Sequence, residues 1–268
     1  MIIFFGTQIY RKENVVKGWT QCEHCGTFAE SVSYDARPWG HVYFIPLFPA
    51  GSKQRFLRQC KKCTIGMQIP LSKLDDVRDE IVEKVVDTLE ELKRGNKEFF
   101  PDEDNCPVPC GTYLANTVST LLCLGEDDEV EKMQDSLEAL HANLELTLVR
   151  GAIHEFYGEE KEAEQCFRSV LKGNYDSIVY PLYLAQHYQR WGYLEDAEEL
   201  YLDGHRRWPD DVSYLEPLLA IYEELKVYED LCDTYEKIFE LVPEMQREKP
   251  FVRAYSKACK KDGRDPLY

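Results

Sequence analysis

Apolar residues recur three or four positions apart through most of the chain after Ser72, which is the spacing of amphipathic helices. The pattern runs without interruption from Leu74 to Gly95, so we expect a single helix of about 20 residues there. Ser72 and Asp75 form a capping-box-like start for this helix. The segment 96–109 loses the periodicity and contains prolines and acidic residues, which predicts a linker.

The chain before residue 70 has a different pattern, of short apolar and aromatic runs broken by glycine and proline. Strands are predicted over Met1–Tyr10 and Phe56–Cys60, and the β-prone run Trp39–Pro49 predicts one or two more that turn back between them. We expect this run to be buried in a small antiparallel sheet. Exposure of the run as an anchor for a membrane or a partner is the alternative.

Beyond residue 143 the sequence repeats with a period of 34 residues, in units at 144–177, 178–211 and 212–245. In the second unit the small residues Ala185 and Ala197 alternate with the large Tyr188 and Tyr201, and Pro209 closes the unit. Small residues let two antiparallel helices approach, whereas large ones fill the space between hairpins. Weaker patterns predict a degenerate hairpin over 110–143 and a capping helix over about 249–261.

These repeats resemble the tetratricopeptide family over about residues 144–245. The resemblance implies a right-handed superhelical stack in which the first helix of each hairpin lines a concave face. Apolar positions edged with acids on that face suit a basic or amphipathic protein segment, and a solvated face without a ligand is the alternative. The candidate partner-binding residues are Leu148, Ala152, Glu155, Phe156, Leu182, Gln186, Gln189, Arg190, Glu216, Ala220 and Glu223.

Four of the ten cysteines form two CxxC pairs, Cys22/Cys25 and Cys60/Cys63, separated by 34 residues. Two thiolates at this spacing can face one ion from a tight loop, and two such pairs complete the tetrahedral sulfur site that zinc accepts. Gly26, after the first pair, suits the positive φ that such turns require. We predict one structural Zn²⁺ that supplies folding energy to a sheet too thin to stand alone.

The segments around these cysteines resemble a family of short zinc-ribbon proteins, mainly bacterial, over about residues 1–68. The shared features are Phe5-Gly6-Thr7, the two cysteine pairs and the segment 44–49 between them. The resemblance implies a zinc-binding domain and brings no particular activity with it. From the residues alone, iron on the same four thiolates, His24 as a ligand and thioredoxin-like chemistry at one CxxC stay open.

The two parts of the chain have net charges of opposite sign, which the total net charge of −17 does not reveal. Residues 1–70 contain nine Lys/Arg against four acidic residues, a net charge of +5, so the remainder carries −22. Such an asymmetry favours two parts with different electrostatic preferences. The predicted organisation is α+β, with a small antiparallel zinc ribbon over 1–70, a connecting helix and linker over 71–109, and an all-α repeat domain over 110–268.

We expect a non-catalytic adaptor that binds a protein or peptide, since the sequence has no phosphate loop, GxGxxG, HExxH or nucleophile elbow. A thiol- or metal-dependent enzyme is one alternative. Nucleic-acid binding is another, through the basic residues near the second cysteine pair, namely Lys53, Arg55, Arg58, Lys61 and Lys62. The absence of a membrane span and the scattered single cysteines predict a cytoplasmic protein.

Overall fold

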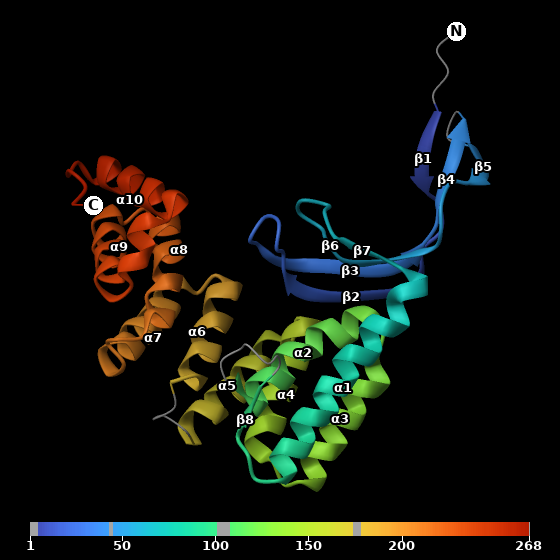
Figure 1. The fold of residues 1–268 in the computed structure, drawn as a ribbon, viewed down its shortest axis with the longest axis horizontal. Coiled ribbons are helices and arrows are strands. Elements are labelled where there is room, and N and C mark those ends of the chain that lie inside the picture. Colours follow the sequence, from blue (N-terminus) through green and yellow to red (C-terminus); the bar gives the residue numbers. More distant parts are fainter. Residues whose placement is uncertain (1–4, 43–44, 101–107, 174–177, 268) are drawn as a thin grey trace. The chain divides into compact units, whose positions relative to one another are not determined.

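A computed structural model describes residues 5–42, 45–100, 108–173 and 178–267, and the chain divides into two compact units, Met1–Val170 and Leu171–Tyr268. Antiparallel strands occupy the first part of the chain and α-helices follow them (Figure 1), which confirms the predicted α+β class. The predicted strand residues 1–4, Tyr43 and Phe44 lie outside the described residues.

The strands of the first unit form two larger antiparallel sheets, where we predicted one. The four-stranded sheet consists, in spatial order, of β2 (Glu13–Gln21), β3 (Phe28–Ala36), β6 (Gln54–Cys60) and β7 (Met67–Pro70). The three-stranded sheet consists of β1 (Phe5–Ile9), β4 (Pro38–Val42) and β5 (Ile45–Pro49). The division falls at Pro38, which has no N–H to continue the pairing of β3 with β6 and instead begins the strand that pairs with β1.

The prediction that the run 39–49 is buried was wrong for β5. Ile45, Leu47 and Phe48 are 62%, 57% and 58% exposed. The apolar core of the β region consists of Tyr34, Ala36 and Phe56, which belong to the four-stranded sheet. The strand β5 lies at the edge of the other sheet, beyond the reach of that core (Figure 1).

The helices of the first unit begin with α1 (Leu74–Lys93), which matches the predicted helix. The capping box does not form, because a 3-10 turn over Leu71–Lys73 precedes α1 and Lys73, at the N-cap, makes no side-chain capping hydrogen bond. Two short strands, β8 (Glu98–Phe99) and β9 (Val108–Pro109), pair within the predicted linker. The helices that follow are α2 (Cys110–Leu124), α3 (Asp127–Ala139), α4 (Asn143–Tyr157) and α5 (Glu160–Gly173).

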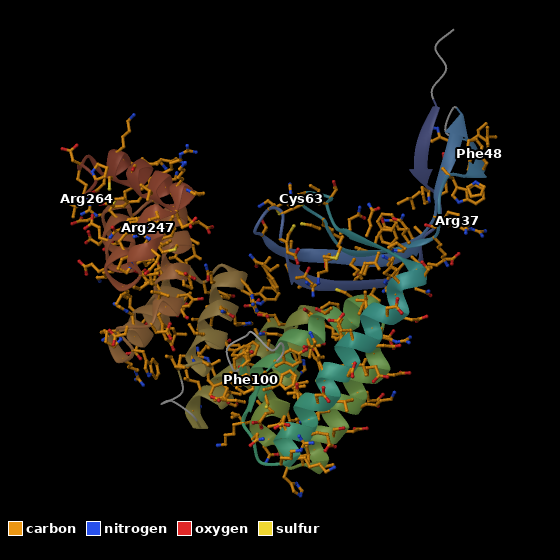
Figure 2. The ribbon with its side chains drawn as sticks, in the orientation of Figure 1. Arg37, Phe48, Cys63, Phe100, Arg247 and Arg264 are labelled. Carbon is orange, nitrogen blue, oxygen red and sulfur yellow. The ribbon has the colours of Figure 1, made fainter. Side chains whose placement is uncertain are left out.

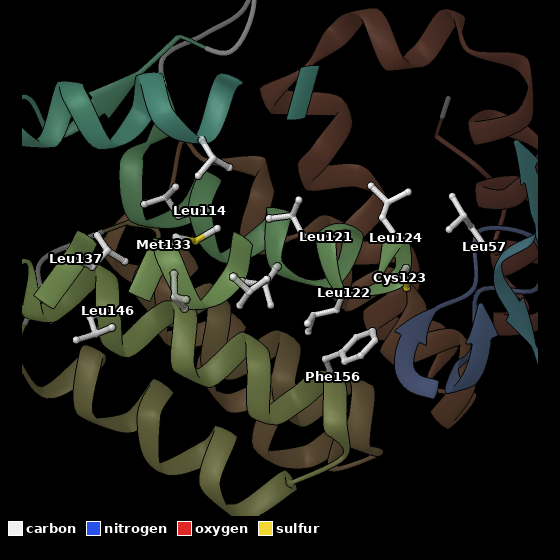
Figure 3. Close-up of a cluster of buried hydrophobic side chains, with 14 residues drawn as sticks. Leu57, Leu114, Leu121, Leu122, Cys123, Leu124, Met133, Leu137, Leu146 and Phe156 are labelled. Carbon is white, nitrogen blue, oxygen red and sulfur yellow. The ribbon is translucent and has the colours of Figure 1, made fainter. Parts of the chain in front are cut away.

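The core of the first unit is centred on α2 (Figure 3). Leu114, Val118 and Leu121 of α2 are fully buried, and they belong to one apolar cluster with side chains of α1, α3 and α4. Leu57 of β6 joins the same cluster, so the four-stranded sheet and the helices share apolar contacts. The helix ends at Gly125, whose φ of 92° is the left-handed conformation of a helix C-cap.

A buried arginine fastens the four-stranded sheet to the end of α2. Arg55 of β6 is 1% exposed, and its Nε and Nη2 donate to the Cys123 carbonyl at 3.2 and 2.7 Å. Its Nη1 donates to the Asn14 carbonyl at 2.7 Å and to Asp35 Oδ1 at 3.2 Å. Because the Cys123 carbonyl belongs to the last turn of α2, it has no partner within the helix. Arg55 supplies that partner and places a cation at the negative end of the helix dipole.

The sheet also covers the C-terminal end of α4. A Cβ at Gly18 of β2 would lie 2.2 Å from Cζ of Phe156, so only glycine lets the strand approach that ring so closely. The neighbouring Trp19 approaches Gly158, which caps α4 with a φ of 78°.

The described part of the second unit is helical. The helices are α6 (Tyr180–Trp191), α7 (Leu194–Arg207), α8 (Glu216–Leu225), α9 (Tyr228–Leu241) and α10 (Lys249–Asp262), with α6 and α7 within residues 178–211 and α8 and α9 within residues 212–245. Consecutive helices pack on each other, with Ala185 and Ala197 fully buried between α6 and α7. Tyr214, between the hairpins, is fully buried against Gly204 and donates to the Ile178 carbonyl. Among the described residues, no helix is both long and apolar enough to cross a bilayer.

Replacing Arg55 with methionine should destabilise the protein strongly. The Arg55→Met side chain keeps the apolar stem, but the Asp35 carboxylate and the Cys123 carbonyl lose a buried partner. We expect the free energy of unfolding, measured by chemical denaturation, to fall by about 3–5 kcal/mol. Arg11→Met, at an exposed position, should change it by less than about 0.5 kcal/mol.

A double variant distinguishes the contribution of the Arg55–Asp35 ion pair to stability from the contribution of side-chain packing. Adding Asp35→Asn to Arg55→Met removes the unpaired buried charge, so the double variant should be more stable than Arg55→Met alone. Equal stability of the two variants would show that the Asp35 charge plays no part.

Candidate metal centre

The two CxxC loops lie side by side because of the sheet order. Cys22 and Cys25 lie in the turn between β2 and β3, whereas Cys60 and Cys63 lie at the turn between β6 and β7. Since β3 pairs with β6, with Ser31 opposite Cys60, both turns fall at the same end of the sheet. The four Sγ atoms lie within 4.8 Å of one another, and within the described residues these four cysteines are the side chains that gather as a metal-binding group.

The two turns have matching backbone geometry. Gly26 N–H donates to the Cys22 carbonyl at 2.8 Å, and Thr64 N–H donates to the Cys60 carbonyl at 2.9 Å. The residue after each second cysteine is left-handed, with φ of 66° at Gly26 and 63° at Thr64. The prediction for Gly26 is confirmed. Thr64 was missed, because a β-branched residue in this conformation is rare and costs roughly 1–2 kcal/mol.

The sulfur positions fit a tetrahedral ion. Cys22 Sγ lies 3.6 Å from Cys63 Sγ, and Cys25 Sγ lies 4.0 Å from Cys60 Sγ. A Zn–S bond of about 2.3 Å sets the edge of a regular tetrahedron at about 3.8 Å. The backbone N–H of Lys62 also donates to Cys60 Sγ at 3.3 Å. These four cysteines can therefore hold one metal ion, and His24 is exposed beside them without belonging to the group.

The thiols at this site differ in acidity. Hydrogen bonds from the backbone and the hydroxyl of Thr27 lower the pKa of Cys25 to about 6. The hydrogen bond from Ile65 acts to lower the pKa of Cys63, but burial and the neighbouring thiols outweigh it and raise that pKa to about 11. The pKa of Cys25 therefore lies well below that of Cys63. Binding of a metal to all four sulfurs must release protons.

A cleft of about 400 Å³ adjoins the first cysteine loop. Leu57, Ile65 and Met67 line it from the second hairpin, and Thr120 and Cys123 line it from α2. The sequence offered no signal for this cleft, because its walls come from segments that only the packing of the sheet on α2 brings together.

The predicted basic cluster is only partly exposed, since Lys61 and Lys62 reach solvent and the other three cations are buried or half-buried. Arg55 is buried, and Arg58 Nη2 donates to Thr120 Oγ1 of α2 at 2.6 Å. Lys53 pairs with Glu13 and Lys61 pairs with Glu30, each at 2.5 Å. The fifth cation, Lys62, donates to Thr27 Oγ1 at 3.0 Å. The side chains proposed for phosphate contact therefore already have partners within the first unit.

The predicted groove residues of the first repeat lie inside the first unit. Leu148, Glu155 and Phe156 of α4 are buried, with Leu148 beside Gly111 of α2 and Phe156 beside Gly18 of β2. Ala152 is half-buried and packs against the apolar cluster around α2. The sheet and α2 thus cover the face that the repeat pattern assigns to a partner.

The corresponding residues of the second unit are more accessible. Four residues of the predicted set lie on α6 and are half-buried, namely Leu182, Gln186, Gln189 and Arg190. The other three lie on α8 and are exposed, namely Glu216, Ala220 and Glu223. Gln189 accepts a hydrogen bond from Tyr201 at 3.0 Å, so this amide is held by the partner helix α7.

Comparison with known proteins adds no relative: a scan against protein-family models matched none, and no curated protein matched the chain. The likeness to zinc ribbons and to tetratricopeptide repeats therefore depends on the sequence motifs and the geometry described above.

The four cysteines should bind one divalent metal ion per chain. Titration with Co²⁺ should saturate at one equivalent and give the visible and thiolate charge-transfer absorption of a tetrahedral sulfur site. Cys60→Ala should abolish that spectrum. Cys123→Ala removes another buried thiol outside the group and should keep it. Retention of the spectrum in Cys60→Ala would contradict the site.

The acidity difference predicts the order of alkylation in protein stripped of metal with a chelator. Because the thiolate is the nucleophile, Cys25 with a pKa of about 6 should react with iodoacetamide about tenfold faster at pH 7 than at pH 5. Cys63, with a pKa of about 11, should stay largely unmodified at both pH values. Peptide mass spectrometry measures both rates, and metal-loaded protein, in which all four sulfurs are ligands, is the control.

Proposed function

We propose that the protein is a non-catalytic adaptor in which one structural Zn²⁺ holds the N-terminal ribbon and the helical hairpins of the second unit bind a protein segment. The convergence of four cysteine sulfurs is the observation that carries this proposal. Four protein ligands close a tetrahedron and leave no position for a substrate or water, which is the arrangement of structural zinc sites. The site then contributes stability rather than catalysis.

Zinc is favoured over iron by the resemblance of the first 68 residues to short zinc ribbons. Both metals accept four thiolates, so the ligand set supports either ion. Metal analysis of the purified protein by mass spectrometry should give one zinc per chain, and iron in its place would overturn this part of the proposal.

The partner surface that we propose is confined to α6, α8 and the turns beside them. The apolar members of this surface are Leu182 on α6 and Ala220 on α8. Gln186 and Arg190 on α6 are polar or basic, and the exposed Glu216 and Glu223 on α8 form its acidic rim. Apolar positions together with exposed acids suit a basic or amphipathic segment. The net charge of −22 beyond residue 70 favours the same kind of partner.

Nucleic-acid binding is the weaker alternative. The ion pairs of Lys53 and Lys61 and the burial of Arg55 reduce the cations available to phosphates. Salt-dependent binding depends on such cations, since each phosphate contact releases counterions.

Charge reversal tests the proposed surface. A peptide library that varies basic and apolar content should yield basic amphipathic binders, and Glu216→Lys with Glu223→Lys should weaken their binding at least tenfold, because two attractive rim charges become repulsive. Fluorescence anisotropy measures the affinities.

The matched control reverses two exposed acids on the second helices of the same hairpins. Glu195→Lys with Glu240→Lys makes the same change of net charge on α7 and α9 and should alter affinity less than threefold. Equal losses in the two double variants would show that net charge, rather than the α6 and α8 surface, controls binding.

A further inference from the structure

The three-stranded sheet of β1, β4 and β5, called the arm below, presents apolar side chains to solvent. Ile45, Leu47 and Phe48 of β5 are each more than half exposed, and Pro46 and Pro49 between and beside them are exposed as well. The ring of Phe48 covers Gly40 of β4 with one face and leaves the rest of its surface open (Figure 2). A contiguous exposed run of this kind marks an interaction site.

The composition of β5 disfavours pairing with another strand. Strand order places β5 at the edge of the arm, where an added strand would need its backbone N–H groups. Pro46 and Pro49 have no N–H, and they make up two of the five residues of β5. An occupant of the β5 edge therefore contacts apolar side chains rather than extending the sheet, which argues against association of two copies through β5.

The segments that join the arm to the four-stranded sheet are positively charged in a strongly acidic protein. The segments 5–12 and 36–54 contain no acidic residue and four cations, whereas the whole chain has a net charge of −17. Lys53 is neutralised by Glu13, and Lys12 lies 3.9 Å from the centre of the Tyr34 ring. Arg11 and Arg37 are exposed.

The cations lie where the arm joins the four-stranded sheet. Arg11 and Lys12 follow β1, Arg37 precedes β4, and Ile9 pairs with Pro38 at this end of the arm. From Pro49 at the same end, β5 extends about 13 Å to Ile45, at about 3.3 Å per residue. Side chains that enter a bilayer interface reach about 5–10 Å deep. The cations would then lie within about one Debye length, roughly 8–10 Å, of the headgroups.

We propose that the arm docks the protein on an anionic membrane surface. Ile45, Leu47 and Phe48 enter the boundary between headgroups and acyl chains, while Arg11, Lys12 and Arg37 attract anionic headgroups. This activity goes beyond protein binding by the helical hairpins, because it uses neither the second unit nor the metal. It would place whatever the hairpins bind beside a bilayer.

Vesicle sedimentation tests the apolar contribution. The full-length protein should bind vesicles of phosphatidylcholine with 30% phosphatidylserine at least tenfold more tightly than vesicles of phosphatidylcholine alone, since about three cations each strengthen attraction to the anionic surface. The triple variant Ile45→Ser, Leu47→Ser, Phe48→Ser should lose at least tenfold in affinity. The matched control Val86→Ser, Leu225→Ser, Leu267→Ser changes three other exposed apolar residues and should bind like the unmodified protein.

A charge-reversal variant tests how much the cations at the base of the arm contribute to membrane binding. Arg11→Glu with Arg37→Glu should weaken binding to the anionic vesicles at least tenfold, and added salt should weaken binding by the unmodified protein. Arg247→Glu with Arg253→Glu makes the same charge change at exposed positions of the second unit and should have less than threefold effect. Retained circular dichroism and the Co²⁺ spectrum show that each variant is folded.

Three results would overturn the proposal. The first is the absence of binding to anionic vesicles by folded protein. The second is equal binding to both kinds of vesicle, or equal loss in the control variants. The third is a concentration-dependent dimer in analytical ultracentrifugation that the serine triple variant abolishes while vesicle binding is unchanged, which would assign the arm to a second copy of the chain.

Discussion

The buried guanidinium of Arg55 is the interaction on which the arrangement of the first unit depends. Removing this charge from water is costly, and the cost is offset because Arg55 reaches two backbone carbonyls and a carboxylate at once. One of those carbonyls terminates α2, so the sheet is held at a particular place on the helices. Apolar packing through Leu57 alone would tolerate sliding, whereas directional hydrogen bonds to a helix end do not.

The four clustered cysteines and Arg55 lie at opposite ends of β6. Cys60 ends that strand and Arg55 stands next to its beginning, while the apolar core between them is limited to a few side chains such as Tyr34 and Phe56. A sheet with so little buried apolar surface needs other sources of stability. Here four clustered thiols lie at the two hairpin turns, and a buried ion pair joins the beginning of β6 to the end of β3.

The sequence predicted those features that depend on the spacing of residues along the chain. It did not predict features that depend on which helices and strands pack together. Helix spans followed from apolar periodicity, and the meeting of the cysteines followed from their spacing. The role of Arg55, the burial of Phe156 and the exposure of Phe48 did not follow, because the same residue types suit either environment. The capping box at Ser72 failed because a 3-10 turn occupies the start of α1. The binding roles of the helical face remain predictions.

The packing of β2 on α4 leaves no room for a side chain at position 18. Gly18 lies against the Phe156 ring and Trp19 lies against Gly158, so the end of α4 is shielded from water by the sheet of the same unit. A larger residue at position 18 would have to push the strand off the helix and uncover Phe156. Substitution in this part of the protein should therefore be tolerated least at a position that carries no side chain at all.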